Sequence, residues 1–132
     1  MKVLKELVRE VEKDGRIVAA ILFGSFVRGE NFRDIDVCLV LKKKMENLEM
    51  SRIRLEYLSK FPDLDIQIFQ QLPIYIRARI LKEGKVICCK DEDLLYDIAI
   101  LSVKEFEDFK HVYKEYLEGV LHGYGKNTGE NR

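Results

Sequence analysis

The stretch from Leu22 to Val37 reads LFGSFVRGENFRDIDV. It joins the end of an apolar segment to a turn of small residues, and the turn leads to two carboxylates that flank one apolar residue. Backbone N–H groups of a Gly-Ser turn can bind phosphate oxygens. Acids at positions i and i+2 of a strand point to the same face. The stretch therefore predicts a site for a nucleoside triphosphate and magnesium.

The segments on either side of this stretch predict an α/β domain. Apolar residues repeat at helical spacing near the N-terminus, and short β-branched runs alternate with amphipathic segments after it. The expected order is helix, strand, strand, helix, strand, helix, strand, helix. The ranges are a helix in 3–13, strands at 17–23 and 35–41, a helix at 46–60, a strand at 64–69, a helix at 73–84, a strand at 85–89 and a long helix at 91–122.

The length of 132 residues favours one domain. We expect that domain to span 1–122, with a core in 1–90 and the C-terminal helix in 91–122. Residues 123–132 carry Gly, Lys, Asn, Thr and Glu without an apolar anchor, so we expect a disordered tail there.

The candidate metal ligands are three acids. Asp34 and Asp36 share one face of a predicted strand, and a divalent cation offsets the cost of placing two carboxylates so close together. Asp65 begins the next strand and faces away from its apolar neighbours, so it is the natural third acid; Asp63 has the same parity and is a weaker candidate. Three converging carboxylates suit phosphoryl transfer with two metal ions. Asp65 could alternatively accept a proton from an incoming hydroxyl.

Each feature taken alone has an ordinary structural interpretation. A Gly-Ser pair is usually a turn, an Asp-x-Asp pair is often a solvated strand end, and Asp65 alone is usually a strand-start acid. The order and spacing of the whole set favour a nucleotidyltransferase-type site.

Composition limits the alternatives. The 23 basic and 23 acidic residues leave no net charge, so no broad nucleic-acid footprint is present. Cys38, Cys88 and Cys89 show neither disulfide nor zinc spacing and are expected to be core residues in a reducing compartment. No signal peptide or membrane-spanning run is visible, so we expect a cytoplasmic protein.

The chain resembles the minimal nucleotidyltransferases, the small branch of the DNA polymerase β-like superfamily. The matching residues are Phe23-Gly24-Ser25, Arg28-Gly29-Glu30, Asp34-Ile35-Asp36 and Leu64-Asp65-Ile66. The resemblance covers roughly the first ninety residues and implies a small mixed sheet of about four strands flanked by helices. The segment between Ser25 and Asp34 is shorter than is common in these proteins, and Arg33 stands where the family usually has Ser.

The resemblance also implies roles for individual residues. Gly24 and Ser25 would bind the β- and γ-phosphates of ATP, and Arg28 would contribute phosphate charge or turn structure. Asp34, Asp36 and Asp65 would form the catalytic metal site, with two Mg²⁺ ions.

Three functions are compared. Relatives of this kind often act as antitoxins beside a helical HEPN-type toxin and modify it with AMP, which implies an adenylyltransferase whose partner is such a toxin. A catalytically silent module that blocks its partner is the second possibility. A small-molecule nucleotidyltransferase of the aminoglycoside type is the third, for which a homodimer could build the acceptor pocket.

Overall fold

The computed structural model describes residues 2–24 and 35–129. Its elements follow the predicted order, with one added 3-10 turn, η2. In chain order they are α1 (Lys2–Lys13), β1 (Ile17–Phe23), β2 (Ile35–Leu41), α2 (Asn47–Lys60), β3 (Leu64–Ile68), η2 (Phe69–Gln71), α3 (Ile74–Glu83), β4 (Lys85–Cys89) and α4 (Glu92–Gly129).

The four strands form one mixed sheet in the order β3-β2-β1-β4. β1 pairs antiparallel with both β2 and β4, whereas β3 runs parallel to β2. Because parallel neighbours need a crossover connection, α2 carries the chain from the end of β2 back to the start of β3. The predicted α/β class and mixed four-stranded sheet are confirmed.

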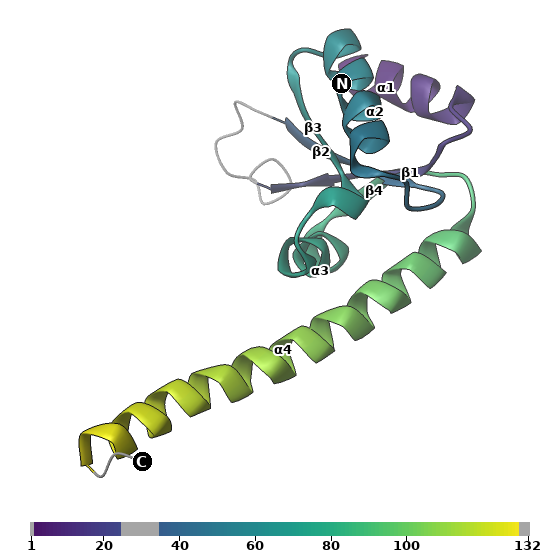
Figure 1. Cartoon of the computed structure of the whole chain (residues 1–132). Helices are drawn as coiled ribbons and strands as arrows, with labels where there is room; N and C mark the ends of the chain where they lie inside the picture. The colour runs from purple at the N-terminus through teal and green to yellow at the C-terminus, as the bar shows by residue number, and fades with distance from the viewer. Residues whose placement is uncertain (1, 25–34, 130–132) are drawn as a thin grey trace.

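Helices cover both faces of the sheet (Figure 1). α1 and α2 bury Leu7, Val11 and Ile53 against one face. On the opposite face, Ile80 of α3 and the first turns of α4 pack on Val18, Ile21, Cys38 and Val40. Alternate residues of β2 therefore belong to different cores. This is why the strand is apolar on both faces after Asp36.

Two boundaries differ from the sequence prediction. β3 ends at Ile68, and the fully buried Phe69 starts η2 instead of extending the strand. The backbone of α4 stays helical as far as Gly129, beyond residue 122, where a tail was predicted to start. The predicted cap of the last helix is confirmed, since the Asp91 carboxylate accepts a hydrogen bond from the backbone N–H of Leu94 at 3.0 Å.

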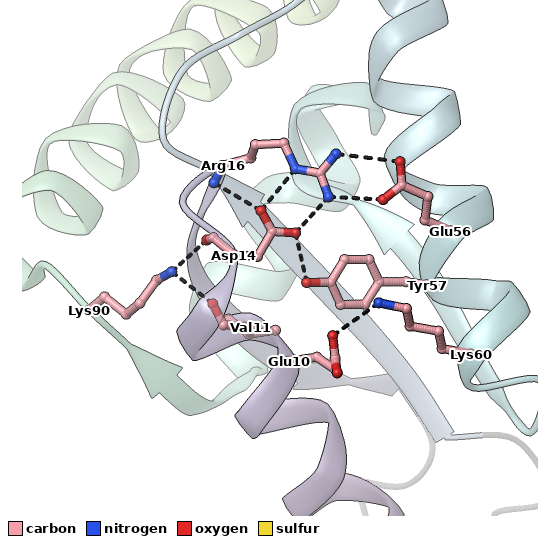
Figure 2. A network of polar contacts seen from close by, with 8 residues as sticks. All are labelled: Glu10, Val11, Asp14, Arg16, Glu56, Tyr57, Lys60 and Lys90. Atoms are coloured by element: carbon pink, nitrogen blue, oxygen red, sulfur yellow. Dashed lines mark hydrogen bonds and ion pairs between the residues drawn. The ribbon is translucent and has the colours of Figure 1, made fainter.

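A polar network fixes the turn that feeds β1 (Figure 2). The Asp14 carboxylate accepts hydrogen bonds from Nε of Arg16 at 2.8 Å, Nη2 of Arg16 at 2.7 Å and the hydroxyl of Tyr57 at 2.9 Å. Arg16 also pairs with Glu56 of α2 at 3.0 Å. Lys90, just after β4, donates to the carbonyls of Val11 and Asp14 at the end of α1. The network thus joins both helices of one face to the start of β1.

We predict that Asp14→Asn destabilises the fold in a pH-dependent way. Hydrogen bonds from Arg16 lower the pKa of Asp14 from 3.8 to about 2. The resulting stabilisation is complete above pH 3.8 and is lost as the pH falls toward 2, and a shift of this size corresponds to about 2 kcal/mol. Urea unfolding should show that loss for the variant at pH 7, nearly the same loss at pH 4 and a clearly smaller difference at pH 3.

Asp97→Asn, on the exposed side of α4, is the matched control and should leave stability within about 0.5 kcal/mol of the parent. A difference between Asp14→Asn and the parent that stays constant from pH 7 to pH 3 would contradict the assignment.

Candidate active site

The sheet register brings two of the predicted acids together. In the parallel pair β2–β3, Asp36 lies opposite Asp65. Neighbouring strands are about 4.8 Å apart, so the two backbones at these positions are direct neighbours. The adjacent residues Val37 and Ile66 point into the core under α1 and α2, so both carboxylates face the side covered by α3 and α4.

Gly24 lies against the carboxylate of Asp36. Its predecessor Phe23 pairs with Asp36 across the antiparallel β1–β2 ladder. The backbone of Gly24 has φ +79°, in the left-handed region that favours glycine. A Cβ built at this position would collide with Oδ2 of Asp36. Glycine therefore permits the close approach of the β1 end to the acidic pair.

Asp65 has a positioning partner that sequence reasoning missed. Nε2 of Gln67 donates to Oδ1 of Asp65 at 3.2 Å. The two residues lie at i and i+2 of β3, so they share a face, and this spacing was a signal in the sequence. The outer edge of β3 is held as well, because Nε of Arg54 donates to the carbonyl of Ile66 at 2.7 Å.

Helix α3 borders the site and supplies a cationic side chain. A cavity of about 170 Å³ is lined by Gly24 together with Phe23, Ile76, Arg79, Ile80 and Glu83. A second cavity of about 430 Å³ shares Ile76, Arg79 and Glu83 with the first and extends along α3 to Phe106. Arg79 therefore lies between the glycine turn and a larger hollow. Nothing in the sequence marked it, because α3 reads as an ordinary amphipathic helix.

Three predicted site residues lie outside the described residues: Ser25, Arg28 and Asp34. Glu30 and Arg33 lie there too. Within 2–24 and 35–129, no group of three His, Cys, Asp or Glu side chains is arranged to hold a metal ion. The described part of the site is thus an acidic pair, Asp36 and Asp65, beside Gly24. Its donor set of carboxylate oxygens fits the oxygen ligands that magnesium prefers.

Comparison with known proteins identifies the family. The family model described as polymerase beta nucleotidyltransferase matches residues 5–93, which include β1, β2 and β3 with Gly24, Asp36 and Asp65. The chain belongs to this nucleotidyltransferase family. The resemblance stated from Gly24, Asp36 and Asp65 is therefore confirmed.

One sequence relative comes from Methanocaldococcus jannaschii and is provisionally named a protein adenylyltransferase. It is 35% identical over 75 residues, which cover 54% of this chain and 56% of the relative. The aligned part thus spans little more than half the length of that relative.

Solved structures share the fold. A chain of a toxin–antitoxin structure with AMP-PNP matches 91% of this chain and 97% of its own length, with a TM-score of 0.67 and 16% identity. A chain from an AMPylated Shewanella oneidensis HEPN toxin in complex with an MNT antitoxin matches 91% and 94%, with a TM-score of 0.63 and 14% identity. At identities this low, these matches show that the chain shares the fold of these structures and no more.

No helix in the described ranges combines the length and the apolar character that crossing a bilayer requires.

The free thiols of Cys38 and Cys88 are buried, as predicted for core residues, and Cys89 is partly buried. Burial raises the pKa of Cys38, which keeps this thiol protonated.

Proposed function

We propose that this nucleotidyltransferase transfers AMP from ATP, with Mg²⁺, to a hydroxyl group of a HEPN-type toxin and thereby acts as the antitoxin of a cytoplasmic pair. Membership of the family supports nucleotidyl transfer. The relative named a protein adenylyltransferase and the fold neighbour solved with an AMPylated HEPN toxin support a protein acceptor. The fold neighbour solved with AMP-PNP supports an adenine nucleotide.

The observation that carries the proposal is the pairing of Asp36 with Asp65 beside the positive-φ Gly24. In the proposal these two acids and Asp34 hold two Mg²⁺ ions. When bound, the ions neutralise the charge that develops on the attacking and leaving oxygens.

The remaining roles are assigned as part of the same proposal. The acceptor oxygen bonds to the α-phosphorus as the bond to the β-phosphate oxygen breaks, and pyrophosphate leaves. Asp65, oriented by Gln67, accepts the acceptor's proton. Following the family resemblance, Gly24 and Ser25 bind the β- and γ-phosphates, and Arg28 contributes positive charge. Arg79, which lines the cavity at Gly24, contributes further positive charge toward the departing pyrophosphate.

ATP labelled at the α-phosphate tests the proposal. The chain is incubated with Mg²⁺, labelled ATP and the protein encoded in the adjacent reading frame. We expect label to move onto that protein, to stop when EDTA is added, and to be absent when ATP carries the label only at the γ-phosphate. A stable complex that never takes label and is unchanged by Asp36→Asn would contradict the enzyme and support a module that blocks its partner.

A further inference from the structure

Helix α4 carries an apolar stripe that extends beyond the part of the domain it packs on. Figure 1 shows the helix projecting away from the sheet and past α3. Apolar or small residues follow the 3-4 spacing of a helix seam along its length. The seam consists of Leu95, Ala99, Ser102, Phe106, Phe109, Tyr113, Tyr116 and Val120.

The first half of the seam is covered within the domain. Ser102 is 3% exposed and donates to the carbonyl of Ile98, and Phe109 stacks on Tyr75 of α3 with ring centroids 6.3 Å apart. Arg77 of α3 pairs with Glu105 at 3.4 Å. Since Tyr75 lies in the first turn of α3, the cover that α3 provides ends near Phe109.

The second half of the seam lies in solvent. Tyr113 is 52% exposed and Tyr116 is 64% exposed. We define the α4 stripe by its residues at i, i+3, i+4, i+7, i+8 and i+11, which are Phe109, Val112, Tyr113, Tyr116, Leu117 and Val120. At ~100° per residue these side chains cover about 140° of the helix, wider than the narrow seam that a single partner helix needs. The width suits a groove between two helices.

The two rims of the α4 stripe differ in charge. Asp108 and Glu115 lie along one side, whereas Lys110 and Lys114 lie along the other. In an antiparallel pair of two copies, the two-fold axis would place each rim beside its own counterpart, acid against acid and lysine against lysine. Like charges at such positions are unfavourable.

A parallel pair of copies is excluded by the position of α3. Both copies would carry α3 on the same seam at the same end, so two helices about 10 Å thick would lie between the α4 helices. The stripes pack only if the helix axes approach to 8–10 Å. Neither arrangement of a second copy therefore suits the stripe.

We propose that the α4 stripe docks into a groove between two helices of a different, helical protein, with Lys or Arg side chains on the groove edge that meets Asp108 and Glu115. This inference rests on the proposed function in one respect, because it takes the helical toxin as the partner. The stripe anchors the partner, and the acidic rim sets its orientation.

The test uses the full-length chain and the protein encoded in the adjacent reading frame, with calorimetry and light scattering. Tyr113→Glu combined with Tyr116→Glu should weaken the complex at least 100-fold, because two charges enter an apolar contact. Glu118→Lys, on the back of the same helix, is the matched control and should change affinity less than about three-fold. Asp108→Lys should weaken binding about ten-fold at low salt and less at high salt.

Measurements of folding and of nucleotide binding show whether a variant has lost only its contact with the partner. All variants should keep the parent's thermal transition and its affinity for a fluorescent ATP analogue. If the protein from the adjacent reading frame binds the double variant and the parent equally well and is labelled equally by both, the docking surface is wrong and the proposed function stands. A dimer of the chain alone that Tyr113→Glu dissociates overturns it in favour of a second copy. If the protein from the adjacent reading frame neither binds the parent chain nor is labelled by it, both proposals are wrong.

Discussion

Asn in place of Asp36 is expected to reduce AMP transfer by at least about 1,000-fold while the domain stays folded. The substitution removes one carboxylate of the pair formed with Asp65 across β2–β3. It keeps the size of the side chain, so the packing of the domain is preserved. The transfer rate is measured with ATP labelled at the α-phosphate, and the thermal transition of the variant reports whether the domain stays folded.

Asp63→Asn is the matched control for that experiment. Asp63 is an exposed acid in the turn before β3, and it was a weaker candidate with the same parity as Asp65. Because it precedes the paired part of the strand, its loss should change transfer less than about three-fold. Full transfer by the Asp36 variant, or equal losses in the two variants, would remove Asp36 from the metal site.

Alanine at Gly24 is expected to reduce transfer by at least about 100-fold and to destabilise the domain by about 1–2 kcal/mol. The added Cβ would collide with Oδ2 of Asp36, and the left-handed backbone at φ +79° is unfavourable for any residue with a side chain. Relief of the collision must move the carboxylate or the β1 end. Both the acidic pair and the phosphate turn then leave their positions.

Gly15→Ala provides the control, because a Cβ at Gly15 meets nothing within 4 Å and Gly15 lies at the other end of β1. Its transfer rate should equal that of the parent. A Gly24 variant with the parent's rate and stability would show that close contact with Asp36 is unnecessary. Transfer assays at saturating and limiting ATP distinguish a displaced carboxylate, which lowers kcat, from a displaced phosphate turn, which raises KM.

The sequence was sufficient to predict the order of elements and the side of the sheet on which Asp36 and Asp65 lie. Periodicity separated helices from strands, and alternation fixed which side of β2 and β3 each acid occupies. Strand adjacency followed from the family resemblance, since alternation alone is silent about which strands are neighbours. The register that places Asp36 opposite Asp65 is a property of the folded sheet.

Other features depend on tertiary contacts that local patterns do not encode. Arg79 and Glu83 line the cavity at Gly24 because the end of α3 packs tightly on β1, where a Cβ at Gly84 would lie 2.6 Å from Cγ2 of Ile21. The exposure of Tyr113 and Tyr116 could not be read from helical spacing, which is the same for a buried face. The roles of Ser25, Arg28 and Asp34 stay predictions, since these residues lie outside the described ranges.

The crossover through α2 has a consequence for biosynthesis. A nascent chain that has emerged only to the end of α2 already contains Gly24 and Asp36, but the strand that carries Asp65 has not been made. Until β3 docks, the open side of β2 exposes unpaired backbone groups and only half of the acidic pair. A product terminated inside α2 would therefore lack Asp65 and the strand that carries it.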